Sequence, residues 1–166
     1  MSANDTLTIL SCQITIPPMT TIAQRDAHLE VSATKVRHQV EQSETPVDLV
    51  VLPELSSIEY ARETFAELAT LAEPLYGPSF QAWRQVAIDL GVFVSYSFPR
   101  AGAGGPFISI GVVDPEGALV GHYDKLHLAQ YGASMEKEYF NRGNHLFTFT
   151  VKGFRLSPII CYDIRI

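Results

Sequence analysis

Short apolar runs bounded by turn-forming residues recur along the chain and predict β-strands. The run at Asp48–Leu52 is almost unbroken, which predicts a strand buried on both faces. Two hairpins are indicated, one around Asp114-Pro115-Glu116-Gly117 and one around Lys152-Gly153, since proline and glycine favour tight turns. The predicted strands are Thr6–Ile14, Asp48–Leu52, Val92–Phe98, Phe107–Val113, Ala118–Tyr123, Leu146–Val151 and Phe154–Ile160.

Between the first strands, apolar residues recur three and four positions apart, which is the spacing of a helix with one buried face. The longest such pattern covers about residues 21–42, and Thr21 with Gln24 predicts a capping box at its start. Two further helices are predicted over Ala61–Leu71 and Ser79–Leu90. Strands that alternate with helices and hairpins predict a mixed α/β layered domain.

Composition narrows the class of protein. The 166 residues, 46% hydrophobic and 18% charged, suit a single globular domain over 1–166. A net charge of −6 without any lysine or arginine run argues against a nucleic-acid partner. No apolar segment approaches the ~18 residues that cross a bilayer, and no secretory signal is visible, so we expect no membrane association and a cytoplasmic location. Cys12 and Cys161 suit a reducing compartment, with Cys12 as a small core residue.

Three side chains with catalytic potential each come just after a predicted strand. Glu54 lies at the end of the second strand, and Lys125 lies just past the fifth. Cys161 directly follows the apolar run Leu156–Ile160. Because α/β enzymes place nucleophiles and ligands beyond the carboxyl ends of strands, this acid, ammonium and thiol form a candidate catalytic set.

The segments around these residues resemble motifs of the carbon–nitrogen hydrolase (nitrilase) superfamily. The resemblance runs from about Leu7 to the last residue, and it implies an α-β-β-α sandwich of the nitrilase type. Members of the family continue well past the nucleophile, so we expect the C-terminal part of the fold to be missing from this chain. The matching motifs, in the family's order, are Leu52-Pro53-Glu54, Tyr123-Asp124-Lys125-Leu126-His127-Leu128, Glu136-Lys137-Glu138-Tyr139-Phe140 with Gly143, and Ile160-Cys161-Tyr162-Asp163-Ile164-Arg165.

The resemblance implies a role for each site residue. Cys161 would be the nucleophile that forms a thioester, and Glu54 the general base. Lys125 and the backbone N–H of Tyr162 would stabilise the oxyanion, while Glu136 would orient Lys125 or the substrate amide. No metal or organic cofactor is implied.

The residues after the cysteine resemble those of omega-amidases and related Nit-like amidases. They imply hydrolysis of a small amide to ammonia and a carboxylic acid, with an N-carbamoyl amide hydrolase or a nitrilase as the alternative. We also expect a homo-oligomer, or a second polypeptide segment, to cover the apolar residues Leu156, Ile159 and Ile160.

Two hypotheses outside the family stay open at this point. A cysteine–histidine hydrolase would pair Cys161 with His127 and would place a histidine nearest the thiol. An inactive fragment or a non-catalytic binding module is the other. A zinc site on His122 and His127 is disfavoured, because no third ligand follows at metal-site spacing.

Overall fold

A five-stranded sheet forms the centre of the computed structural model, which describes residues 6–166. The strands lie side by side in chain order, and the first three are parallel. Helical crossovers join these three strands, whereas the later ones follow short connections and are antiparallel. The strands are β1 (Ile9–Ser11), β2 (Leu49–Val51), β3 (Phe93–Arg100), β4 (Phe107–Val113) and β5 (Leu119–Asp124).

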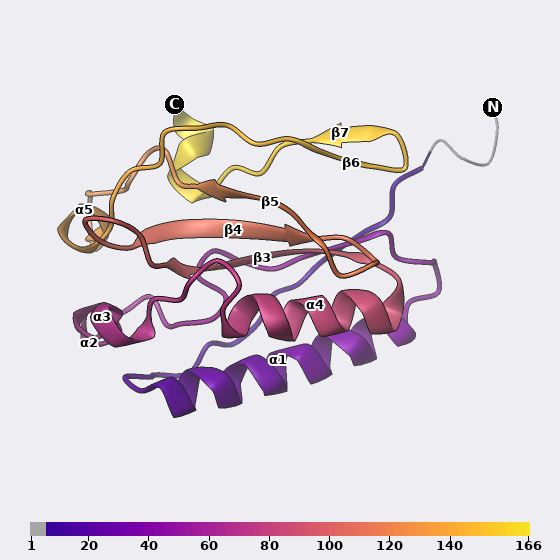
Figure 1. The fold of residues 1–166 in the computed structure, drawn as a ribbon, viewed down its shortest axis with the longest axis horizontal. Helices are drawn as coiled ribbons and strands as arrows, with labels where there is room; N and C mark the ends of the chain where they lie inside the picture. Colours follow the sequence, from indigo (N-terminus) through magenta and orange to yellow (C-terminus); the bar gives the residue numbers. More distant parts are fainter. Residues whose placement is uncertain (1–5) are drawn as a thin grey trace.

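Two long helices, α1 (Ile22–Glu41) and α4 (Pro78–Leu90), cover one face of this sheet (Figure 1). The predicted capping box is confirmed at the start of α1, where Thr21 and Gln24 bond to each other's backbone N–H. Gly91 ends α4 in the left-handed conformation, at φ 64°. The core beneath the helices includes the fully buried Trp83, Val86, Val50, Val94 and Tyr96.

The opposite face carries a hairpin of β6 (Phe149–Val151) and β7 (Phe154–Leu156), followed by the C-terminal helical turn (Figure 1). Phe149 and Val151 pack against Leu49 and Val112 of the sheet, which forms a second apolar layer. Residues 6–166 thus form a helical layer, a central five-stranded sheet and a second sheet of two strands. None of the helices in this range is long and apolar enough to cross a membrane.

The predicted helix over Ala61–Leu71 is instead two short helices, α2 (Arg62–Ala66) and α3 (Leu68–Leu71). The chain turns between them at Glu67, with φ −98° and ψ 13°. This turn allows Phe65 and Leu68 to bury in one cluster around Leu55 and Phe140. Burial of these side chains outweighs the small gain from continuing a single helix.

Four of the strands are shorter in the structure than predicted, and for Asp48–Leu52 the difference is one residue at each end. The Phe154–Ile160 segment is a strand only to Leu156, because residues 157–160 pair with no strand of the described chain and Pro158 lacks an N–H. Within it Ile160 is buried, whereas Ile159 is 52% exposed. The strands predicted over Thr6–Ile14 and Leu146–Val151 shorten to β1 and β6, since their partners are themselves only three residues long.

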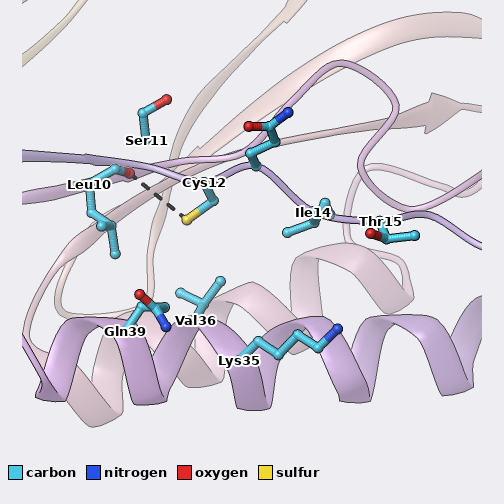
Figure 2. A pocket seen from close by; sticks show the side chains of 9 residues that line it. Leu10, Ser11, Cys12, Ile14, Thr15, Lys35, Val36 and Gln39 are labelled. Atoms are coloured by element: carbon cyan, nitrogen blue, oxygen red, sulfur yellow. Dashed lines mark hydrogen bonds between the residues drawn. The ribbon is translucent and has the colours of Figure 1, made fainter.

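A cavity of about 550 Å³ lies between α1 and the chain segment that follows β1 (Figure 2). Lys35 and Gln39 line it from the helix, and Cys12 and Ile14 line it from the extended segment. Cys12 is therefore half-buried at the rim of the core, and not enclosed by it as predicted. Its thiol lies 4.0 Å from the Leu10 carbonyl oxygen, and burial raises its pKa. Glu54, Lys125 and Cys161 do not line this cavity.

Candidate active site

Glu54 lies on a loop that leaves the sheet directly after β2. The backbone N–H of Leu55 donates to the Ser97 hydroxyl at 3.0 Å, and the Ser56 hydroxyl donates to the Ser97 carbonyl oxygen at 2.8 Å. Leu55 is fully buried in the left-handed conformation, at φ 48°, which turns the chain sharply just after the acid. The Glu54 side chain remains 20% exposed.

Lys125 begins the loop that follows β5. Its N–H donates to the Ile108 carbonyl oxygen at 2.9 Å, and its own carbonyl oxygen accepts from Gly143 N–H at 2.9 Å. Gly143 approaches so closely that an added Cβ would overlap the Asp124 carbonyl. Glycine at 143 therefore serves close packing, and it holds the lysine backbone at a fixed place. The Lys125 side chain is fully buried.

Glu136 begins α5 (Glu136–Tyr139) and is buried, although Lys137 and Glu138 beside it are exposed. Oε2 of Glu136 accepts from Ala129 N–H at 2.8 Å, and Oε1 accepts from the Tyr60 hydroxyl at 3.1 Å. A glutamate on a solvated loop would not be buried in this way. Arg142 donates to the Leu126 carbonyl oxygen at 2.7 Å and so also holds the lysine loop in place.

One ammonium lies between two carboxylates. The Lys125 Nζ is 2.6 Å from Glu54 Oε1 and 2.8 Å from Glu136 Oε2. Burial by itself lowers the pKa of Lys125, but the Glu54 and Glu136 carboxylates outweigh it and raise that pKa above its ordinary value. Burial raises the pKa of Glu54, and the charge of Glu136 adds to this, against the lowering effect of Lys125. Lys125 is therefore charged at neutral pH, and Glu54 is a stronger base than an ordinary glutamate.

Cys161 is the first residue of η1 (Cys161–Arg165) and lies in the left-handed region, at φ 46°. Non-glycine residues adopt this conformation rarely and mostly where the surrounding structure enforces it. Glu54, Lys125 and Glu136 are the ionisable side chains that act on the thiol. Burial, and then the charge of Glu54, raises the pKa of Cys161, while Lys125 lowers it. The resting site is therefore a neutral thiol beside a carboxylate that can accept its proton.

The four sequence-predicted side chains, of Glu54, Lys125, Glu136 and Cys161, are thus brought into one cluster from four separate segments. Tyr162, predicted to supply a backbone N–H, follows the thiol in the first turn of η1, where helical N–H groups lack intrahelical acceptors. The residue Cys161 is exposed, so a small molecule can reach it.

His127 does not pair with the thiol. Its Nδ1 lies 3.0 Å from Asp163 Oδ1, and the ionisable groups that act on Cys161 are Glu54, Lys125 and Glu136. The geometry therefore disfavours a cysteine–histidine hydrolase. Within residues 6–166, no group of three or more His, Cys, Asp or Glu side chains is placed to hold a metal ion.

Sequence reasoning missed three residues that hold the site. Ser97 fixes the Glu54 loop, Tyr60 binds Glu136, and Asp163 accepts hydrogen bonds from the lysine loop. Periodicity gives no sign of Ser97 or Tyr60, because their contacts join residues 42 and 76 positions apart. Asp163 lies in the motif that contains Cys161, but its position in the sequence indicates no role for it.

Comparison with known proteins identifies relatives that are similar to most of this chain. The family model described as carbon-nitrogen hydrolase matches residues 9–166. An (R)-stereoselective amidase from a Pseudomonas species is 29% identical over 87% of this chain and 50% of its own length. The human omega-amidase NIT2 is 29% identical over 70% of this chain and 44% of its own length. The chain therefore spans about half the length of the curated relatives that it matches.

An amidase from Nesterenkonia sp. shares the fold, with a TM-score of 0.72 at 22% identity over 96% of this chain. This match confirms the predicted nitrilase-type α/β fold, and it covers 57% of the amidase chain, so residues 6–166 form part of that fold. A solved structure of a mutant of the same amidase shows covalent addition of the acetamide moiety of fluoroacetamide at its active site cysteine.

Proposed function

Because the chain belongs to the carbon-nitrogen hydrolase family, we propose that it hydrolyses the C–N bond of a small amide and releases ammonia and a carboxylic acid. The proposal is supported by the 2.6 Å contact between the Lys125 ammonium and the Glu54 carboxylate, and by the effect of both groups on the Cys161 thiol. The amidases among the relatives, and the modified active site cysteine of one of them, support the same reaction class.

In the first half of the reaction, Cys161 Sγ attacks the amide carbonyl carbon while its proton passes to Glu54. The new C–S bond yields a tetrahedral oxyanion. Collapse of this species breaks the C–N bond, and Glu54 returns the proton to the departing nitrogen, which leaves as ammonia. The enzyme then carries a thioester on Cys161.

The oxyanion accepts hydrogen bonds from the Lys125 ammonium and the Tyr162 backbone N–H. A charged donor that is already fixed in place stabilises the developing charge without reorganisation. Glu136 keeps Lys125 in this position, because both of its oxygens lie within 3 Å of Nζ. In the second half, Glu54 takes a proton from water as the water oxygen attacks the thioester carbon. The C–S bond then breaks to release the acid, and Glu54 returns the proton to the sulfur.

The same residues could act on an N-carbamoyl amide or a nitrile, since both offer an electrophilic carbon bonded to nitrogen. Amide hydrolysis is preferred, because the residues after Cys161 resemble those of omega-amidases and the matched curated relatives include amidases. We further propose a cytoplasmic protein in which a second copy or a further polypeptide segment covers Ile159 and the open edge of the sheet at β1.

The test is ammonia release from a series of small amides, nitriles and N-carbamoyl compounds, in the presence of a chelator. Cys161→Ala is expected to abolish turnover, whereas Cys12→Ala, the matched control, retains it. Turnover by Cys161→Ala would contradict the mechanism. Hydrolysis of nitriles without hydrolysis of amides would contradict the reaction class.

A further inference from the structure

One buried carboxylate connects the nucleophile turn to the lysine loop. The Asp163 side chain is 4% exposed, and each of its oxygens contacts two polar groups. Oδ2 accepts from the Tyr123 hydroxyl at 2.7 Å and from Ile160 N–H at 3.0 Å. Oδ1 accepts from His127 N–H at 2.9 Å and contacts His127 Nδ1 at 3.0 Å. The mechanism above does not use Asp163.

On the nucleophile side, the carboxylate fixes the ends of the turn that contains Cys161. Ile160 precedes the cysteine and Asp163 follows it by two residues, so their hydrogen bond closes the turn across the thiol. The Asp163 N–H donates back to the Ile160 carbonyl oxygen at 3.0 Å. These two bonds hold Cys161 in its left-handed conformation, from which a free turn would relax.

On the lysine side, the same carboxylate orients the two peptide groups that come after Lys125. His127 N–H donates to it directly. Leu126 N–H donates to the Tyr123 hydroxyl at 3.3 Å, and that hydroxyl donates in turn to Asp163. Burial, and then the bond to Asp163, raises the pKa of Tyr123, so this phenol remains a donor at neutral pH. Glu54 and Glu136 therefore hold the ammonium of Lys125, while Asp163 holds the backbone beyond it.

We propose that Asp163 is a positioning residue that sets the placement of the Cys161 thiol relative to Lys125 by binding both loops through one carboxylate. The proposal extends the function proposed above, but the placement of the thiol can be measured without turnover. The charged groups that face the thiol are Glu54, Lys125 and Glu136. If the turn relaxes, the thiol leaves the Glu54 carboxylate and titrates at a lower pH, nearer to an ordinary cysteine.

The test uses Asp163→Asn, which keeps the shape of the side chain. In either orientation of the amide, its NH₂ group takes the place of one carboxylate oxygen and can no longer accept the hydrogen bonds made there. We expect kcat for amide hydrolysis to fall about 100-fold with little change in KM, as for a reacting group displaced by roughly 1 Å. The pH midpoint of Cys161 alkylation by iodoacetamide should also move down. Tyr123→Phe, which removes one donor, should lower kcat roughly tenfold and move the midpoint in the same direction.

Asp114→Asn serves as the control, because Asp114 caps the β4–β5 turn through Glu116 and Ala118 N–H and lies outside the site. It should leave kcat and the midpoint unchanged. A folded Asp163→Asn protein with unaltered kcat and midpoint overturns the proposal. If that variant does not fold, unaltered values in Tyr123→Phe overturn it. If the unsubstituted protein hydrolyses no amide, the proposed function fails, and the alkylation midpoint alone decides the role of Asp163.

Discussion

The Glu136 carboxylate contacts the Lys125 ammonium through both of its oxygens, at 2.9 Å from Oε1 and 2.8 Å from Oε2. With Glu54 at 2.6 Å, one ammonium is the shared partner of a buried carboxylate, Glu136, and a partly buried one, Glu54. A buried ion pair contributes little net stability compared with apolar packing, but the loss of one partner is costly. This asymmetry makes the site easy to test by single substitutions.

Lys125→Met should lower the free energy of unfolding by about 3–5 kcal/mol at neutral pH, because it leaves two carboxylates without their cation. Urea denaturation measures the change. Lys137→Met is the matched control, since Lys137 is exposed in the same segment as Glu136, and its effect should stay within about 0.5 kcal/mol.

The deficit of Lys125→Met should shrink as the pH falls, because burial raises the pKa of Glu54 and the acid then takes up a proton at mild acidity. In the unsubstituted protein, the stabilising effect of Lys125 depends on pH in the opposite direction. Its folded pKa is raised, so its stabilising effect is present below the ordinary value of 10.5 and is lost only as the pH rises through the raised one. A deficit that is constant between pH 4 and pH 8 would argue against a buried, unpaired Glu54.

Glu136→Gln should move the acid limb of the kcat/KM profile to lower pH. The proposed base must be ionised, and burial followed by the charge of Glu136 raises the pKa of Glu54. Removal of that charge lowers the pKa, so activity persists to more acidic conditions even though kcat itself decreases. Glu138→Gln, two residues away and exposed, should leave the limb in place.

Glu54→Gln should abolish hydrolysis and lower the pKa of the Cys161 thiol, because the Glu54 charge raises that pKa. The pH dependence of iodoacetamide alkylation at Cys161 reports the shift. An unchanged midpoint would mean that the acid and the thiol are not neighbours in solution.

Gly143→Ala should destabilise the lysine loop, since the new methyl group would overlap the Asp124 carbonyl. Overpacking of this kind typically lowers the free energy of unfolding by about 1–3 kcal/mol. We expect kcat to fall as well, because Asp124, whose carbonyl must move, directly precedes Lys125. Gly132→Ala is an informative comparison: nothing lies within 4 Å of its Cβ position, so only its positive φ of 57° opposes the change. Thermal unfolding of the two variants separates steric overlap from backbone conformation.

The sequence predicts what local chemistry controls. The Thr21–Gln24 capping box and the Lys152-Gly153 turn are confirmed because each depends on a few adjacent residues. The loops of Glu54 and Lys125 also lie at one edge of the sheet as expected, because β2 and β5 run in the same direction. The lengths of the strands could not be predicted, because β1 pairs only where β2 offers a partner. Nor could the contacts of Tyr60 be found, since they depend on the final packing of distant segments.

The left-handed backbone at Cys161 has an evolutionary consequence. Glycine is the residue that this conformation favours, by about 1–2 kcal/mol over a residue with a side chain. The protein therefore carries, at the position of the proposed nucleophile, a residue that folding alone would disfavour. Cys161→Gly should unfold at a higher temperature than Cys161→Ala, while both lack activity. The difference in unfolding temperature measures the stability that is lost by having a side chain at this position.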